Sequence, residues 1–162
     1  MIDRPVSDVM DQDAPTVTAD TTTGDLVRLL AERGLDGVAV VDGDGAVVGI
    51  VTGGDLLYQE VEADEDMPYY NGLVDWAMGV ASLGSWERHV EKAFAVTVAD
   101  LMTAEVHTAT TATTVHEAAK LMAHEDVSQL PVVGKDGRYA GMLTRVGVIR
   151  ALDRFEFGGG AG

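Results

Sequence analysis

The densest group of side chains that could do chemistry is an acidic run with five carboxylates in seven residues, Glu60-Val61-Glu62-Ala63-Asp64-Glu65-Asp66. Carboxylate oxygens are preferred ligands of Mg²⁺ and Ca²⁺, so this run could collect a divalent cation loosely. A run of like charges is also typical of a solvated loop. Two alternatives therefore stay open for this segment: a metal-sensing or protein-interaction surface, and a plain surface loop.

The sequence lacks the residues and motifs that mark common classes of enzyme and metal site. The chain has no cysteine, which excludes disulfides, thiol catalysis and thiolate metal sites. It contains no G-x-x-x-x-G-K-[ST], H-E-x-x-H or G-x-S-x-G motif, and its four histidines lack ligand-like spacing. Asp42-Gly43-Asp44-Gly45 begins like a calcium loop but lacks the later ligands. We expect no catalytic residue, no metal ligands and no catalytic cofactor.

The charge is strongly acidic, with 27 Asp and Glu against 11 Lys and Arg and a formal net charge of −16. Such a field repels nucleic-acid backbones and anionic membranes, so neither is an expected partner. Two interpretations remain: an acidic partner-binding face, or adaptation to a salt-loaded cytoplasm, which the even spread of the acids favours. Apolar runs are short and the N-terminus has no apolar segment, so we expect a cytoplasmic protein.

The chain repeats itself at an offset of 92 residues. Residues 6–10, Val-Ser-Asp-Val-Met, return at 98–102 as Val-Ala-Asp-Leu-Met, and Gly49-Ile50-Val51-Thr52 returns as Gly141-Met142-Leu143-Thr144. Over about fifty positions the two copies align without a gap, and such repeats set the architecture. Two copies of one unit usually pack about a pseudo-twofold axis with paired clefts at their seam. This pattern suggests a ligand-sensing module rather than an enzyme.

Each copy is expected to fold as strand, helix, strand, strand, helix after a short helical turn, giving an α+β protein packed through its two sheets. The patterns Thr22-x-x-Asp25 and Thr114-x-x-Glu117 predict capping boxes at the first helix of each copy. The expected elements are turns at 6–10 and 98–102, strands at 16–18 and 108–110, strands at 37–41 and 129–133 with a hairpin partner each, and second helices from 55 and 147.

The sequence divides into four parts: residues 1–57 as the first copy, 58–97 as an insertion, 98–152 as the second copy, and 153–162 as a flexible Gly-rich tail. The insertion has apolar residues at helical spacing and both tryptophans, Trp76 and Trp86. It is interpreted either as a helix that covers the module's own core or as a dimer or partner surface.

The order of elements and the motif Gly49-Ile50-Val51-Thr52-Gly53-Gly54-Asp55 resemble the CBS (cystathionine-β-synthase) domain, which occurs in tandem pairs called Bateman modules. The family pattern is an apolar-P-V-V-D strand, a turn, and G-h-h-[ST]-x-x-D, where h is apolar. The first copy matches with residues 38–42 and 49–55, and the second with residues 130–134 and 141–147. The resemblance covers nearly the whole chain outside the tail, and the insertion looks like a linker of some stand-alone prokaryotic members.

The resemblance implies a regulatory module that binds AMP, ADP, ATP or S-adenosylmethionine, forms a homodimer and acts on a separate protein. Asp55 would accept from the two ribose hydroxyls, the alternative being a plain helix N-cap. Thr52 would donate to ribose or phosphate, and the amides after Gly53 and Gly54 would meet a phosphate. The adenine would lie against residues of the first two strands: Thr16, Val17, Gly37, Val38 and Ala39.

The second copy departs from the family pattern because Gly147 stands where the first copy has Asp55. We expect one good site per chain and a weaker cleft in the second copy, lined by Thr108, Pro131 and Thr144. Arg145 could reach a phosphate of the ligand or form a surface ion pair. Asp36 would oppose a polyphosphate, which favours AMP, adenosine or a cationic adenosyl compound over ATP.

Overall fold

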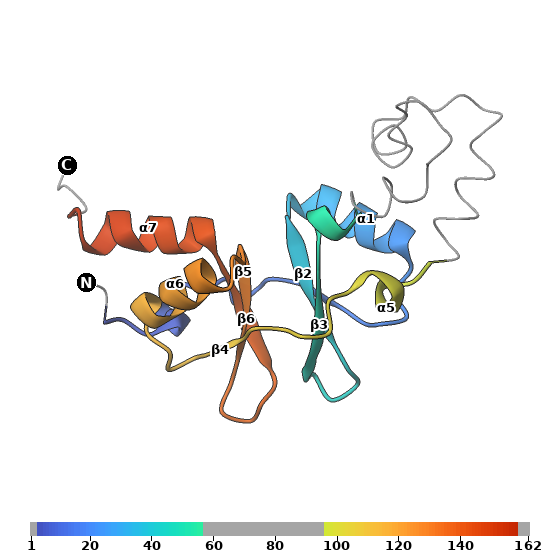
Figure 1. The fold of residues 1–162 in the computed structure, drawn as a ribbon, viewed down its shortest axis with the longest axis horizontal. Coiled ribbons are helices and arrows are strands. Elements are labelled where there is room, and N and C mark those ends of the chain that lie inside the picture. Colours follow the sequence, from blue (N-terminus) through green and yellow to red (C-terminus); the bar gives the residue numbers. More distant parts are fainter. Residues whose placement is uncertain (1–2, 57–95, 159–162) are drawn as a thin grey trace. The chain divides into compact units, whose positions relative to one another are not determined.

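The computed structural model describes residues 3–56 and 96–158 (Figure 1). In the first copy, the elements are η1 (Val6–Asp8), β1 (Thr16–Val17), α1 (Thr23–Arg33), β2 (Gly37–Val41) and β3 (Val47–Thr52), followed by helical residues 53–56. In the second copy they are α5 (Val98–Leu101), β4 (Ala109–Thr110), α6 (Val115–His124), β5 (Gln129–Val133), β6 (Tyr139–Thr144) and α7 (Arg145–Phe155).

Two three-stranded sheets of the same topology form within these residues, in the orders β1-β2-β3 and β4-β5-β6. β1 pairs with β2 in parallel, as β4 does with β5, and the intervening helix makes the crossover that a parallel pair requires. β6 returns antiparallel to β5 through the turn at Gly137, whose φ is 77°. The α+β class and the strand-helix-strand-strand-helix order are confirmed. The tryptophans, the acidic run and the end of the Gly-rich tail lie outside the described residues.

Local sequence signals explain how the first helix of each copy begins. At α6, Thr114 accepts from the Glu117 amide at 3.2 Å while the Glu117 carboxylate accepts from the Thr114 amide at 2.9 Å, a complete capping box. At α1, Thr22 accepts from the Asp25 amide at 3.2 Å, but the Asp25 carboxylate pairs with Arg28 instead. The predicted box is therefore complete in the second copy and one-sided in the first.

The helices also end alike, at positions 92 residues apart. Gly34 follows α1 with φ 61°, and Asp126 follows α6 with φ 51°. This left-handed conformation suits glycine, and Asp is one of the few other residues that adopt it readily.

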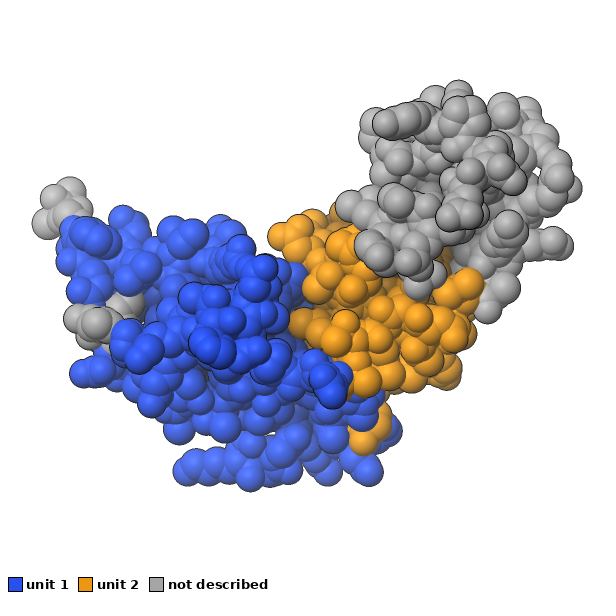
Figure 2. Space-filling model, viewed as in Figure 1, with its two compact units in different colours: residues 1–15, 43–48, 105–162 blue, residues 16–42, 49–104 orange. Residues whose placement is uncertain are grey.

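The chain divides into two compact units that do not follow its order (Figure 2). One unit comprises residues 1–15, 43–48 and 105–162, and the other comprises residues 16–42 and 49–104. The segment that opens each copy thus belongs to the unit built on the other copy's sheet.

Matching backbone bonds hold these opening segments in place. Asp11 and Met142 exchange two bonds of 2.9 Å in the first unit, and Ile50 and Thr103 exchange bonds of 3.0 and 2.9 Å in the second.

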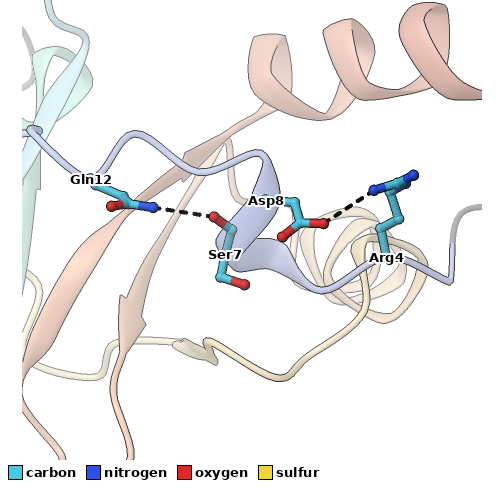
Figure 3. Close-up of polar contacts among 4 residues, drawn as sticks. All are labelled: Arg4, Ser7, Asp8 and Gln12. Carbon is cyan, nitrogen blue, oxygen red and sulfur yellow. Dashed lines mark hydrogen bonds and ion pairs between the residues drawn. The ribbon is translucent and has the colours of Figure 1, made fainter.

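The opening segment of the first unit is further fixed by its own polar contacts (Figure 3). Arg4 pairs with Asp8 at 3.4 Å, and the Gln12 amide donates to the Ser7 carbonyl at 3.4 Å. The Arg4 guanidinium also lies 4.4 Å from the ring centroid of Phe155 near the end of α7. The contact with Phe155 joins the start of the chain to the second copy's last helix.

The core of the first unit lies between its sheet and the helices α6 and α7, which lie on one face of the β5-β6 hairpin (Figure 1). Alternate residues of the strands enter it because side chains alternate along a strand. The buried cluster consists of Val6, Ala109, Val115, Ala118, Met122, Leu130, Val132, Leu143, Val148 and Ala151.

Candidate functional site

The site expected in the first copy lies at one end of its sheet, where β1 and β2 begin and β3 ends. Thr16 opens β1 and stands opposite Ala39 of β2 in the parallel register. Gly37 opens β2, and Thr52 closes β3. The Gly53 amide donates to the Asp36 carbonyl at 2.8 Å, which ties the end of β3 to the start of β2. The topology therefore gathers these residues at one edge of the second unit.

Asp55 and Thr52 form a capping pair at the helix that follows β3. Helical residues start at Gly53, so Thr52 occupies the N-cap position and Asp55 the third helical position. The Asp55 Oδ2 atom accepts from the Thr52 amide at 2.8 Å and from the Thr52 hydroxyl at 3.1 Å. Asp55 is therefore not the N-cap itself. Its Oδ1 atom accepts no hydrogen bond from the described residues.

The geometry limits what the Thr52 hydroxyl can offer to a ligand. The Thr52 hydroxyl gives its hydrogen to Asp55, so toward a ligand it acts as an acceptor rather than as the expected donor. The Gly53 amide donates to the Asp36 carbonyl. Contact of a phosphate with the amides after Gly53 and Gly54 stays a prediction. The half-buried Asp55 carboxylate is the charged group that remains.

The predicted adenine-contact residues divide between two faces of the sheet. Thr16, Gly37 and Ala39 share one face, because Thr16 pairs with Ala39 and side chains alternate along β2. Val17 and Val38 point to the other face; their equivalents in the second copy, Ala109 and Leu130, belong to the helix-side core. Ala39 is 0% exposed and Val38 is 1% exposed, and contact of these residues with an adenine stays a prediction.

Arg145 belongs to the other compact unit, at the start of α7. Its guanidinium pairs with Asp126 at 3.3 Å, and both side chains are exposed. The alternative role that the sequence left open, a surface ion pair, is thus the one that the structure shows. A contact of Arg145 with a phosphate stays a prediction.

The second copy has the same backbone arrangement at the end of its sheet, with different side chains. Thr144 caps α7, and its hydroxyl oxygen accepts from the Gly147 amide at 3.0 Å. The Arg145 amide donates to the Ser128 carbonyl at 3.0 Å, the equivalent of the Gly53–Asp36 bond. Pro131 is fully buried in β5, and Thr108 is exposed just before β4. Because Gly147 stands at the position of Asp55, the second copy has no carboxylate at this helix start.

One cluster in the second copy was not foreseen from the sequence. Glu125 lies between two imidazoles, 2.8 Å from His124 Nδ1 and 3.4 Å from His107 Nε2. The hydrogen bond with His124 is the largest cause that lowers the pKa of Glu125. Nothing in the spacing of residues 107, 124 and 125 indicates this contact, because it depends on where the segment before β4 runs.

No group of three or more His, Asp or Glu side chains in the described ranges is arranged to hold a metal ion. The acidic run at residues 60–66, which carried the metal-sensing alternative, lies outside those ranges. Among the described helices, none has the length and apolar character needed to cross a bilayer.

Comparison with known protein families identifies the family to which both copies belong. The model of the CBS domain matches twice, over residues 6–62 and 98–154. The chain belongs to the CBS domain family. Together the two matches form a tandem CBS pair, so the resemblance seen in the sequence is confirmed.

Individual CBS proteins resemble the whole chain. The uncharacterized protein MJ1426 of Methanocaldococcus jannaschii is 31% identical over 133 residues, 79% of each chain. The chloroplastic CBS domain-containing protein CBSX2 of Arabidopsis thaliana is 29% identical over 140 residues, which are 86% of this chain but 59% of CBSX2. The chain thus spans about three-fifths of CBSX2.

Solved structures show the same arrangement. The crystal structure of CBSX2 in complex with AMP is 27% identical and superposes with a TM-score of 0.70, covering 94% of this chain and 98% of that one. The CBS domain pair of MJ0100, solved with 5′-methylthioadenosine and S-adenosylmethionine, is 20% identical, with a TM-score of 0.67 and coverages of 94% and 98%. At that identity the second likeness concerns the fold alone.

Proposed function

We propose that this CBS pair is a regulatory module that binds an adenosine-containing ligand in its first copy and does not alter it chemically. The observation that carries the proposal is the Asp55 carboxylate, held by two bonds from Thr52 with Oδ1 left open. A carboxylate accepts well from two neighbouring hydroxyls, and a ribose presents such a pair. The relative CBSX2 has been crystallised with AMP, which supports the ligand class.

The charge around the site favours a ligand with little negative charge. Asp36 is exposed beside the start of β2, and the chain as a whole has a net charge of −16. We therefore place AMP, adenosine and S-adenosylmethionine ahead of ADP and ATP, since like charges oppose a polyphosphate.

A thermal-shift screen tests the function. Adenosine, AMP, ADP, ATP and S-adenosylmethionine are compared with GMP, and the ligands are analysed afterwards for chemical change. A ligand of the native state stabilises by about 2.7 kcal/mol at 100 times its Kd, so a binder should raise the Tm measurably. We expect a rise with an adenosine compound that the Asp55→Ala variant loses, and recovery of the ligand unchanged. Equal Tm values for all compounds, or turnover of one, would contradict the proposal.

We further propose that the chain forms a homodimer, as the resemblance implies, and that α7 contributes to the contact. Val146 and Ile149 on its outward face are 52% and 61% exposed, and Leu152 is 38% exposed. Exposed apolar side chains that gather on one face mark association surfaces. Light scattering should show a dimer for the wild type and folded monomers for Ile149→Asp, whereas a dimeric variant would exclude this face.

A further inference from the structure

Two methionines at equivalent positions of the two copies pack against glycines of the sheets. Met10 and Met102 are related by the offset of 92 residues, as are Gly49 of β3 and Gly141 of β6. A Cβ atom built on Gly49 would lie 2.6 Å from the sulfur of Met102, and one built on Gly141 would lie 3.1 Å from the sulfur of Met10. Each sulfur therefore lies where a side chain would begin, at a strand position that has room only for glycine.

The residue that follows each methionine is bonded to the strand next to the glycine. Asp11 exchanges two backbone hydrogen bonds with Met142, and Thr103 exchanges two with Ile50. A backbone pairing and a sulfur contact on neighbouring residues thus hold each opening segment against its strand. The repetition of both features in the two copies indicates one device that is used twice.

Each of these contacts lies within one compact unit. Met10 and Gly141 belong to the first unit, and Met102 and Gly49 belong to the second. Met10 is one of the partly buried residues that pack against the core cluster of its unit. Gly141 faces the same side of β6 as Leu143 of that cluster, because side chains alternate along a strand. The sulfur of Met10 therefore lies at the edge of the helix-side core.

The sulfur atoms of these two residues are within reach of an oxidant. The chain has no cysteine, so methionine carries all of its sulfur. Met10 and Met102 keep part of their surface in solvent, whereas Met122 and Met142 are only 3% and 4% exposed. Peroxides convert methionine to its sulfoxide, and exposure favours this reaction. The two packed sulfurs should therefore react before the two buried ones.

We propose that Met10 and Met102 are peroxide-sensitive latches, which hold the opening segments as thioethers and loosen them as sulfoxides. The sulfur attacks one oxygen of hydrogen peroxide, the O–O bond breaks, an S=O bond forms, and the second oxygen leaves as water with both protons. The thioether is oxidised by two electrons and the peroxide is reduced. The product is polar and chiral, and its oxygen needs room and a hydrogen-bond donor. A sulfur packed this closely on a glycine has little room to give. The proposal does not depend on the proposed ligand.

The test exposes the full chain to hydrogen peroxide under native conditions and follows each methionine by peptide mass spectrometry. Met10 and Met102 should form sulfoxides several-fold faster than Met122 and Met142, and the Tm should fall by roughly 4–10 °C as they do. Methionine sulfoxide reductases for both epimers should restore the Tm. The double variant Met10→Leu, Met102→Leu nearly conserves volume, and its Tm should resist the same treatment although five of the seven methionines remain.

A glycine variant separates the latch from general oxidative damage. In a Met10→Leu background, Gly49→Ala should already displace the sulfur of Met102, so oxidation of Met102 should lower the Tm by less than it does without the alanine. Gly43→Ala in the same background is the matched control, because a Cβ atom there would meet nothing within 4 Å. If Gly49→Ala does not fold, the single variants Met10→Leu and Met102→Leu replace it, and each should lose about half of the wild-type fall in Tm.

The contrary outcomes are equally specific. The proposal is overturned if positions 10 and 102 stay thioethers while Met122 and Met142 are oxidised, or if complete oxidation of Met10 and Met102 leaves the Tm unchanged. An equal fall in Tm for the wild type and the double leucine variant would assign the effect to other methionines. A fall that is the same in Gly49→Ala and Gly43→Ala would show that oxidation does not act through the contact with glycine.

Discussion

Replacing Asp55 with alanine should weaken both ligand binding and the fold, by amounts that can be separated. The variant removes the acceptor of two bonds from Thr52, at 2.8 and 3.1 Å, and losing such a cap costs about 0.5–2 kcal/mol. It also removes a charged acceptor for the ribose hydroxyls, and a hydrogen bond to a charged group contributes about 1.5–3 kcal/mol. Because 1.4 kcal/mol is a factor of ten, the ligand Kd should rise roughly 10- to 150-fold.

Glu117→Ala is the matched control, because Glu117 makes the same two bonds with Thr114, each at 2.9 Å. Urea unfolding should show a similar loss of stability in the two variants, and titration calorimetry should show a loss of affinity only in Asp55→Ala. The ligand affinity and the stability of Asp55→Asn should lie between those of the wild type and Asp55→Ala, because the amide oxygen can still accept from Thr52 but carries no charge. An unchanged Kd in Asp55→Ala would refute the ribose role. A Kd that rises equally in Glu117→Ala would show that the effect is stability alone.

Four further outcomes are expected. Gly147→Asp should supply the missing carboxylate to Thr144, stabilise α7 by roughly 0.5–1 kcal/mol and make the two sites more nearly equal by calorimetric stoichiometry; a single tight site would contradict this. Gly34→Ala should cost about 1 kcal/mol in urea unfolding because φ is 61°, while Gly43→Ala, with equally open space and no positive φ, should be near neutral. Hydrogen bonds from Thr114 lower the pKa of Glu117 from 4.5, so the ionised carboxylate stabilises the fold above its unfolded pKa, and this stabilisation is lost as the pH falls through its folded pKa. Glu117→Gln should therefore be less stable than the wild type at neutral pH, and this difference should shrink below about pH 4. A difference that stays constant with pH would exclude this linkage. The Tm of the wild type should rise from low salt to molar KCl because screening relieves the repulsion of a net charge of −16, whereas an unchanged Tm would refute the salt-adapted interpretation.

The repeat made most of the fold predictable from the sequence. A constant offset of 92 residues fixes the same element order in both copies, and Thr114-x-x-Glu117 marks the start of α6 at the residue where the structure begins it. These signals are local, because a cap or a hairpin turn is decided by a few neighbouring residues. The family resemblance added the edge of the sheet at which to look for a site.

Details that depend on contacts distant in sequence could not be predicted. The pairing of residues 11 and 142, and of residues 50 and 103, decides which sheet receives each opening segment, yet no spacing along the chain indicates it. The bond from the Gly53 amide to the Asp36 carbonyl likewise depends on the approach of two strand ends. Even the local Thr52–Asp55 contact was not foreseen: the sequence offered Asp55 as a ribose acceptor or as a plain N-cap, whereas its carboxylate accepts from both the amide and the hydroxyl of Thr52.

On the proposed role of Asp55, the Thr52–Asp55 pair should couple ligand binding to helix stability in the first copy alone. The carboxylate that would hold the ribose through Oδ1 also orders the helix start through Oδ2, so a bound ligand limits the motion of Asp55 and thereby secures the N-cap. In the second copy, Gly147 has no side-chain acceptor for Thr144, so this coupling is missing at the start of α7. A ligand in the second cleft would therefore not secure the start of α7 through such a pair. Regulation by an adenosine compound should therefore act through the helix that begins at Gly53.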